Sequence, residues 1–374
     1  MLIRWITLFS LLATVPFARS QALPGTGLLT EKADFADLMP TGMQQYLDRE
    51  NASARNQREQ FWHLDFSSKE AYLHSVEENR KEFRRIIGVV DARVRPEAPF
   101  ATAPYFATSK IGRGSGYNVL AVRWHVLAGL DGEGLLLKPD REPRARIVAL
   151  PDADQSPEGL IGLTPGVPRE LQFARRLAEN GALVLVPVLL DRSPTGIANP
   201  MVPRATNQTH REFIYRMAYE VGRHIIGYEV QKSLAAIDWM EQSRPAAPLG
   251  IIGYGEGGLI ALYAAASDTR VQSIATIGYF APREIWSEPV YRNVWSLLKQ
   301  FGDAEITRLI APRPIGVQPG PAPAVLEPPP ANKVNGIGAA PGALHPPVES
   351  AVLAEVERAR PVSSLSLPTG IQLA

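Results

Sequence analysis

Short apolar runs alternate with segments of helical periodicity through the middle of this chain. The runs have the length of buried strands, and they lie at residues 147–150, 182–190, 249–252, 273–280 and 314–317. Between them, residues 169–178, 210–239 and 259–266 repeat apolar positions at helical spacing. Strands that alternate with helices predict an α/β fold, in which a mostly parallel sheet has helices on both faces.

The pattern differs at the two ends of this region. Residues 33–85 are rich in charged and polar side chains with apolar positions spaced for helices, and Ser68 is placed to cap one of them. Residues 117–124 and 134–137 flank Asp131-Gly132-Glu133, which predicts a hairpin with its turn there. Repeated prolines from 319 to 330 predict a loop or extended linker, and residues 348–358 predict a short helix. Residues 370–374 resemble the start of a strand without continuation, so we expect the sheet to lack its last strand.

These changes of pattern predict four parts of the chain. Residues 1–22 form a signal peptide, residues 23–103 an N-terminal helical extension, residues 104–317 the α/β domain, and residues 318–374 a proline-rich segment with a short helix and tail. The first part has Arg4, an apolar stretch at 5–15 and small residues up to Ala22, as secretory signals do. That stretch is shorter than the roughly 20 residues that span a bilayer. We therefore expect export to the periplasm or beyond, without membrane association after cleavage.

Composition removes several classes of function. The chain has 374 residues, 45% of them hydrophobic, and a formal net charge of +1, which leaves room for a large core. This balance gives no support to a nucleic-acid partner. The absence of cysteine excludes disulfides, thiolate metal sites and cysteine nucleophiles. We expect no metal and no cofactor, and the sequence carries no signal for an oligomeric state.

The segment 251–262 holds the most informative motif. In serine hydrolases the pattern GxSxG forms a sharp turn from strand to helix, the nucleophile elbow, which projects the serine hydroxyl. When Gly253 and Gly257 take the two flanking positions, Gly255 stands at the nucleophile position, and it has no side chain for covalent catalysis. The alternative register would make Glu256 the nucleophile, but it puts Tyr254 where a small residue is wanted.

In its order of elements the chain resembles the α/β-hydrolase superfamily, near the secreted acetylxylan-esterase and dienelactone-hydrolase-like proteins. The resemblance spans residues 105–317. It is carried by the hairpin at 119–137, the elbow frame at 253–258, Asp268-Thr269-Arg270, and Ile310-Ala311-Pro312-Arg313-Pro314. It implies one oxyanion amide from the loop 151–155, with Asp152 and Ala153 but without the usual His-Gly pair. It implies a second oxyanion amide from Glu256.

The resemblance also locates the acid and the histidine of the catalytic triad. The acid would follow the strand at 314–317, where Gln318 stands, and the histidine would lie beyond Ala374. Glu327 and His345 keep the order nucleophile, acid, base, but we interpret them as loop residues. Tyr279, which follows the strand after the elbow, is a candidate for the pocket wall. The serine mechanism is thus missing at more than one position.

Glu256 leaves two interpretations open. A carboxylate in the first turn of a helix is stabilised there without any function. The alternative is a general base that activates water in the emptied nucleophile position, which needs a raised pKa. The same glycines, 253 to 258, fit the dinucleotide pattern GxGxxG, so a nucleotide or phosphate site is a second hypothesis, and a purely structural or interaction role is a third.

Other polar residues lack a decisive pattern. Those at strand ends are open to a role in a pocket or in capping a loop: Asp191, Arg192, Arg283 and Glu284. Arg223 and His224 lie on the long helix before the elbow, and we interpret them as polar residues turned toward a neighbouring loop, with catalysis as the alternative. Asn51-Ala52-Ser53 and Asn207-Gln208-Thr209 match the glycosylation pattern, which is frequent by chance. We therefore expect an exported α/β-hydrolase-like protein that has lost the serine mechanism. It would bind a small ester or carbohydrate-like ligand, or cleave one weakly through Glu256.

Overall fold

The computed structural model describes residues 23–27, 30–95, 100–101, 110–195, 206–243, 246–283, 287–332, 336–363 and 371–373. The expected signal peptide, residues 1–22, lies outside them. Two compact units divide the chain at residues 49 and 50. The smaller unit holds the first part of α1 (Phe35–Gln57), a helix with no buried residue. The larger unit, residues 50–374, holds every other element.

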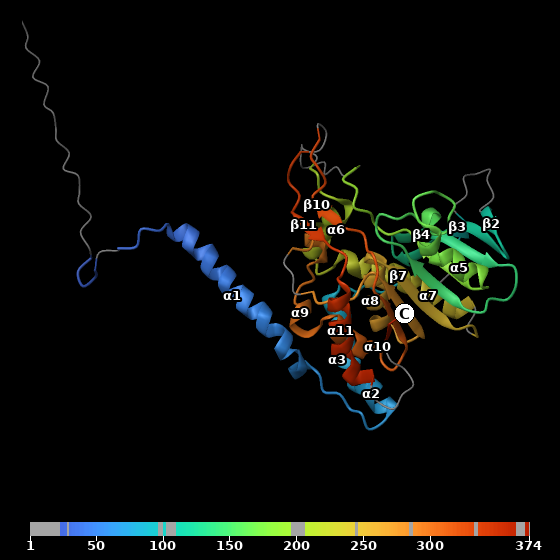
Figure 1. Cartoon of the computed structure of the whole chain (residues 1–374), viewed down its shortest axis with the longest axis horizontal. Coiled ribbons are helices and arrows are strands. Elements are labelled where there is room, and N and C mark those ends of the chain that lie inside the picture. The colour runs from blue at the N-terminus through green and yellow to red at the C-terminus, as the bar shows by residue number, and fades with distance from the viewer. Residues whose placement is uncertain are drawn as a thin grey trace, which may run out of the picture. The chain divides into compact units, whose positions relative to one another are not determined.

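A mixed ten-stranded sheet forms the centre of the larger unit (Figure 1). Its strands lie in the order β1 (Phe100–Ala101), β3 (Tyr117–Leu127), β4 (Leu130–Pro139), β6 (Leu183–Pro187), β5 (Arg146–Leu150), β7 (Leu249–Tyr254), β8 (Ser273–Ile277), β9 (Ile315–Gln318) and β12 (Ile371–Leu373), with β2 (Lys110–Gly114) paired to β3. From β6 to β12 every neighbouring pair is parallel. The expected α/β fold with a mostly parallel sheet is confirmed.

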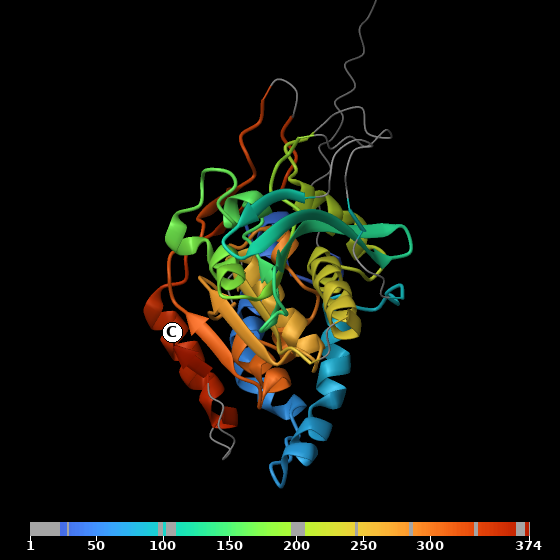
Figure 2. The same cartoon turned by 90° about the vertical axis from the view of Figure 1, so that its right-hand side faces the viewer.

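Helices cover both faces of this sheet, as the unbroken apolar character of its inner strands requires. One face carries α7 (Ile225–Ser243) and α8 (Glu256–Ser267), with α3 (Glu77–Ile86) and α10 (Asp303–Ile310) packed beyond them. The other face carries α4 (Pro157–Leu160) and α5 (Phe173–Glu179) over a separate apolar cluster. Figure 2 shows α11 (Glu349–Ser363), in red, on the flank of the sheet away from α7. The core thus lies mainly around α8, all of whose residues are buried.

Short elements complete the larger unit: the 3-10 helices η1 (Arg58–Phe61), η2 (Arg169–Leu171) and η3 (Val290–Arg292), and the helices α2 (Lys69–Ser75), α6 (His210–Tyr219) and α9 (Leu297–Gln300). Ser68 caps α2 by accepting a hydrogen bond from the Ala71 amide, as its position predicts. The Tyr72 hydroxyl donates to the Arg308 carbonyl at 2.7 Å, so this N-terminal segment is fastened to α10.

Four expectations about individual elements are wrong. The hairpin turn lies at residues 128–129, because Trp124 pairs with Gly132 and His125 with Asp131 inside the ladder. The helix expected over 210–239 is broken into α6 and α7 around Gly222, whose φ of 67° is a conformation that glycine adopts without strain. The last strand is present, since β12 pairs with β9 over residues 371–373. The proline-rich stretch contains β10 (Val325–Glu327), which pairs with β11 (Gly342–Leu344).

The order of the strands fixes where a ligand can bind. The chain runs from β5 to β6 on one side, and then returns to place β7 on the other side of β5. In open α/β sheets, ligands bind outside the carboxyl ends of the strands at such a reversal. The loops after β5 and β7 meet there, and they contain Asp152 and Gly255.

Candidate functional site

The turn between β7 and α8 has the geometry of a nucleophile elbow. Gly255 has φ 57° and ψ −118°, a backbone conformation that costs most side-chain-bearing residues free energy. A Cβ atom on Gly253 would lie 2.0 Å from the Gly257 carbonyl oxygen, and one on Gly257 would lie 2.3 Å from the Pro151 carbonyl oxygen. The flanking glycines are therefore required by close backbone contacts, as the elbow interpretation predicts.

A carboxylate occupies the space where a nucleophile at the elbow would begin. A Cβ atom built on Gly255 would lie 2.5 Å from Asp152 Oδ1, far inside van der Waals contact. Asp152 itself is buried, so its carboxylate cannot simply turn out to solvent. Serine at residue 255 would require this side chain to move.

The same carboxylate takes up the oxyanion amide. The Glu256 amide, which the resemblance implies as an oxyanion donor, donates to Asp152 Oδ1 at 2.9 Å. The Asp152 amide in turn donates to Gln155 Oε1 at 3.2 Å. Oxyanion catalysis needs donors directed at the place where negative charge develops. Here a fixed negative charge already holds that donor, so a substrate oxygen would have to displace an anion.

Glu256 lies at the centre of a buried group of arginines. Arg292 donates from Nε and Nη2 to Glu256 Oε2 at 2.9 and 2.7 Å, and Arg211 Nη2 donates to Oε1 at 2.8 Å. Arg192 Nη2 lies 3.4 Å from Glu256 Oε2, and Arg192 Nη1 donates to Asp152 Oδ2 at 2.7 Å. We call Glu256 with Arg192, Arg211 and Arg292 the arginine cluster.

The arginine cluster decides the charge of Glu256. Burial alone would raise the pKa of Glu256, but the positive charges of Arg292, Arg211 and Arg192 outweigh it and hold the pKa well below its usual range. The general-base interpretation requires the opposite shift. Both carboxylate oxygens also accept hydrogen bonds from guanidinium groups, so neither is oriented toward a water.

Three different elements deliver the arginines. Arg192 follows β6, Arg211 lies in the first turn of α6, and Arg292 ends η3. The Tyr291 ring joins two of them: its hydroxyl accepts a hydrogen bond from Arg192 Nε at 2.9 Å, and the Arg211 guanidinium lies 5.0 Å from the ring centroid. Sequence reasoning named Arg192 but missed Arg211 and Arg292, because no spacing along the chain links them to the elbow.

Tyr279 reaches a second buried carboxyl group. Its hydroxyl donates to Asp303 Oδ1 at 2.9 Å, and the Ala281 amide donates to Asp303 Oδ2 at 3.1 Å. Burial raises the pKa of Asp303 to about 7, although the charge of Arg283 opposes the shift. Asp303 was not identified from the sequence.

A cavity of about 330 Å³ opens over the elbow, and we call it the elbow pocket. Of the candidates named from the sequence, it is lined by Asp152, Gly255, Glu256, Tyr279, Arg283 and His345. Ala153 is buried and does not line this pocket. Its remaining wall is mostly apolar, with Phe280, Pro323 and Leu344 among its members. The volume lies at the lower end of the range for small-molecule sites, roughly 300–1,000 Å³.

His345 and Glu327 both come from the proline-rich part of the chain, but they lie in different surroundings. His345 is exposed and lines the elbow pocket. Glu327 is buried, lies outside the lining of that pocket, and accepts a hydrogen bond from the Thr209 hydroxyl at 3.3 Å. Burial raises the pKa of Glu327.

The other polar candidates have structural partners. His224 Nδ1 accepts from the Ile226 amide and Nε2 donates to the Asn293 carbonyl oxygen; burial lowers the pKa of His224 to about 4. Arg223 pairs with Asp91. Asp191 pairs with His210. Glu284 lies outside the described residues.

The second hypothesis, a nucleotide or phosphate on the glycine turn, requires free amides at the start of α8. The Glu256 amide is bound to Asp152, and the Gly258 amide donates to the Gly255 carbonyl oxygen at 3.0 Å. An anion at this turn would also lie beside the Asp152 carboxylate. The geometry disfavours this site.

Two negative findings apply only to the residues that the structure describes. Among them, no helix is both long and apolar enough to cross a bilayer. Nor do those residues contain a group of three or more histidine, aspartate and glutamate side chains arranged to hold a metal ion.

Comparison with known proteins supports the resemblance to dienelactone-hydrolase-like proteins. The dienelactone hydrolase family matches residues 158–292, which include the elbow but make up less than half of the chain. YtaP of Bacillus subtilis (strain 168), a candidate hydrolase, is 31% identical over 110 residues. That alignment covers 27% of this chain and 37% of YtaP, so only about a third of the relative's length is spanned.

One solved structure supports the fold, and a second is similar at a lower level. A candidate acetyl xylan esterase from Bacteroides fragilis NCTC 9343 superposes with a TM-score of 0.57 at 16% identity, covering 87% of this chain and 80% of that protein. The glucuronoyl esterase of Solibacter usitatus gives a TM-score of 0.44 at 14% identity, covering 80% of this chain and 82% of that chain. The fold, the elbow geometry and the match over the elbow segment together show that this chain has an α/β-hydrolase-like fold.

Proposed function

We propose that this protein binds a small carbohydrate-ester-like ligand in the elbow pocket and does not hydrolyse it by a serine mechanism. The observation that carries the proposal is the position of the Asp152 carboxylate. It stands 2.5 Å from where a Cβ atom of residue 255 would lie, and it accepts the hydrogen bond of the oxyanion amide. One side chain thus opposes both the nucleophile and the oxyanion donor.

Hydrolysis by water through Glu256 is the competing form of this proposal. We assign Glu256 a structural role instead, as the anion that Arg192, Arg211 and Arg292 share. Its pKa is lowered and both its oxygens are engaged, so it lacks the basicity that water activation needs.

The class of ligand is inferred from the pocket and from the relatives. The pocket has a largely apolar wall with a few polar groups at its base, which is typical of sites for small molecules. The Bacteroides fragilis relative is described as a candidate acetyl xylan esterase. An acetylated sugar ring combines an apolar acetyl group with hydroxyls, and therefore suits both kinds of wall.

Export is the second element of the proposal, and it rests on the layout of residues 1–22. N-terminal sequencing of the protein recovered from its producing cells checks it. We expect the mature chain to begin after Ser20 or Ala22. Recovery of a chain that still begins at Met1 from the cytosol contradicts export.

Two measurements on the purified chain test the site. With p-nitrophenyl acetate we expect no burst of product. A serine-directed fluorophosphonate should not label the protein. With acetylated xylo-oligosaccharides we expect a thermal stabilisation that is lost in Ala351→Leu, which extends a side chain of the pocket wall into the elbow pocket. Ala354→Leu, on the exposed face of the same helix, is the matched control and should keep the stabilisation.

Turnover that the fluorophosphonate abolishes would overturn the loss of the serine mechanism. No stabilisation by the oligosaccharide, or equal stabilisation of both variants, would overturn ligand binding in the elbow pocket.

A further inference from the structure

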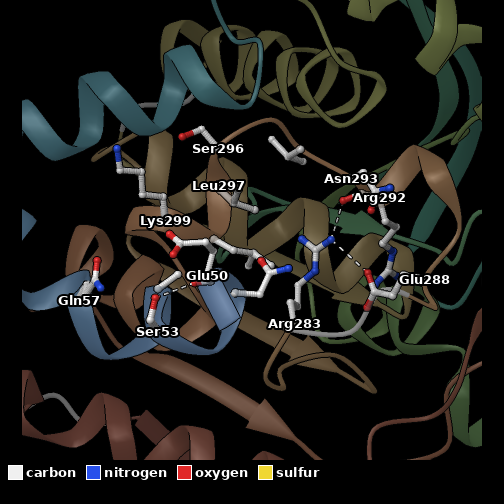
Figure 3. A pocket seen from close by; sticks show the side chains of 14 residues that line it. Glu50, Ser53, Gln57, Arg283, Glu288, Arg292, Asn293, Ser296, Leu297 and Lys299 are labelled. Carbon is white, nitrogen blue, oxygen red and sulfur yellow. Dashed lines mark hydrogen bonds and ion pairs between the residues drawn. The ribbon is translucent and has the colours of Figure 1, made fainter. Parts of the chain in front are cut away.

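A second cavity, of about 520 Å³, lies between the end of α1 and the segment that joins η3 to α9 (Figure 3). All its lining residues belong to the larger unit, residues 50–374. Arg283, Glu288 and Arg292 line both this cavity and the elbow pocket, so they form the wall between the two. We call it the amide cavity, after the side chains described next.

Three side-chain amides face the amide cavity: those of Asn51, Gln57 and Asn293. Within the described part of the chain, no hydrogen bond engages any of these three amide groups. Each amide offers two donors and one acceptor oxygen. Asn51 belongs to the Asn-Ala-Ser pattern noted in the sequence, and the structure turns it toward a cavity.

A serine hydroxyl adds to this set. Ser296 lines the amide cavity at the N-terminal end of α9, but its side chain makes no capping hydrogen bond there. Serine at the N-cap position normally accepts a hydrogen bond from a helix amide. The Ser296 hydroxyl makes no such bond and can therefore bind a ligand in the cavity.

Carboxylates lie beside both arginines of the amide cavity. Arg283 Nη2 lies 3.1 Å from Glu288 Oε2, and Arg292 is bound to Glu256 at 2.7 Å behind the wall. The remaining cation, Lys299, lies 5.7 Å from the Phe61 ring centroid, and the lining also holds the carboxylate of Glu50. The two acidic residues of the lining, Glu50 and Glu288, oppose the binding of a phosphate or a carboxylate.

These features describe a ligand that has many hydroxyls and no net charge. Small-molecule pockets are usually lined mostly by apolar groups. Most residues that line the amide cavity are polar or charged, and its apolar residues are Ala54, Val294, Leu297 and Leu298. A hydroxyl both donates and accepts, as a side-chain amide does, and a sugar ring has an apolar C–H face that suits such a patch.

We infer that the amide cavity is a binding site for a neutral polyol, of the size of one or two sugar rings, separate from the elbow pocket. Asn51, Gln57 and Asn293 bind its hydroxyls, and the paired arginines of the wall keep it apart from the ligand of the elbow pocket. The site does not depend on the proposed function, because none of these three amides lines the elbow pocket.

Saturation-transfer-difference NMR with D-xylose and D-glucose as probes tests the inference. We expect transfer to at least one sugar, and a loss of affinity of about fivefold for each amide removed, which corresponds to roughly one hydrogen bond. The variants are Asn51→Ala, Asn293→Ala and Gln57→Ala. Because Gln57 is exposed, its variant keeps the test valid if another one fails to fold.

Asn56→Ala removes an exposed amide of the same helix that does not line the cavity, and it should leave transfer unchanged. Ala351→Leu, which obstructs the elbow pocket, should also leave it unchanged. Absence of transfer to both sugars, or equal transfer in the amide variants and Asn56→Ala, overturns the inference. Loss of transfer in Ala351→Leu places the sugar in the elbow pocket and overturns it as well. Inorganic phosphate should not stabilise the protein against heat. If phosphate does stabilise it, and Asn51→Ala removes that stabilisation, the cavity binds an anion and the inference of a neutral ligand is contradicted.

Discussion

Glu256 and Asp303 are both fully buried carboxyl groups, yet their environments drive their pKa values in opposite directions. Burial raises the pKa of Asp303 to about 7, and the charge of Arg283 and the hydrogen bonds from the Tyr279 hydroxyl and the Ala281 amide lower it too little to reverse this shift. Burial acts on Glu256 in the same way, but direct contact with Arg292 and Arg211 reverses the outcome. The difference shows that contact with guanidinium groups, and not depth, sets the charge of a carboxyl group in this core.

The comparison also separates a fixed group from one that titrates. The pKa of Glu256 is held well below its usual range, so Glu256 is ionised at neutral pH, where its charge binds the three arginines. Asp303 changes its charge near neutral pH beneath Tyr279, which lines the elbow pocket. Three substitutions test this contrast.

The largest effect is expected from Glu256→Gln. The substitution keeps the shape but leaves the three buried arginines without their central anion. Removal of one partner from a buried ion pair costs about 3–5 kcal/mol of unfolding free energy. Urea denaturation at pH 7 measures it, with Glu78→Gln, an exposed carboxylate, as the control near zero.

The sign of the pH dependence provides a second check on Glu256. Because the folded-state pKa of Glu256 lies below the usual glutamate value of 4.5, the stabilisation by Glu256 is present above pH 4.5 and is lost as pH falls. A loss below about 1 kcal/mol in Glu256→Gln at pH 7 would show that the arginines need no anion.

Asp303→Asn should raise the free energy of unfolding above neutral pH, whereas Glu256→Gln lowers it. A carboxyl group whose folded-state pKa is raised from 3.8 to about 7 stabilises the fold below pH 4, and this stabilisation is lost as pH rises through 7. Asparagine avoids this cost and still offers an oxygen to Tyr279. At pH 8 we expect the variant to be more stable than the parent by up to about 4 kcal/mol, with the difference vanishing near pH 4.

Thermal melts of both proteins from pH 4 to pH 8 make the comparison, with Glu78→Gln again as the control. A variant that is less stable than the parent at pH 8 would mean that Asp303 is ionised and paired in the folded protein.

The sequence predicted what depends on local pattern. Period and length located the strands from β5 to β9, and the glycine spacing identified the elbow, because close backbone contacts at Gly253 and Gly257 leave a signature in adjacent residues. The boundary between α6 and α7 was missed since a single glycine at a positive φ interrupts a continuous helical period. Residues 370–374 were recognised as strand-like, but their place in the sheet as β12 was missed, because three residues carry too little pattern to predict their pairing with β9.

The chemistry of the site depends on residues that are distant in the sequence. Arg211 and Arg292 reach Glu256 from 45 and 36 positions away, and Asp152 reaches it from 104. No spacing rule connects such positions, so the sequence left Glu256 open between a base and a structural group. The role of Asp152 could not be foreseen either, since the resemblance pointed to its backbone amide and the structure uses its side chain.

The smallest effect is expected from Gly255→Ser, which tests how firmly the arginine cluster holds its neighbour Asp152. The change has two costs, a positive φ and the contact with Asp152 Oδ1 at 2.5 Å. Gly116→Ser isolates the first cost, because Gly116 has φ +80° and open space where a Cβ atom would lie. We expect Gly116→Ser to lose about 1 kcal/mol of unfolding free energy and Gly255→Ser to lose about 2–3 kcal/mol.

A double-mutant cycle with Asp152→Ala then separates the clash from the backbone strain. Removal of the carboxylate makes room for the serine, so the double variant should be more stable than the sum of the single changes predicts, by at least about 0.5 kcal/mol. Neither Gly255→Ser nor the double variant should hydrolyse p-nitrophenyl acetate, because among the described residues no carboxylate is hydrogen-bonded to His345, the histidine that lines the elbow pocket, to orient it as a base. Strict additivity in the cycle would mean that the Asp152 side chain moves aside freely when residue 255 gains a side chain. Arg192, which binds both carboxylates, would then hold Glu256 in place but not Asp152.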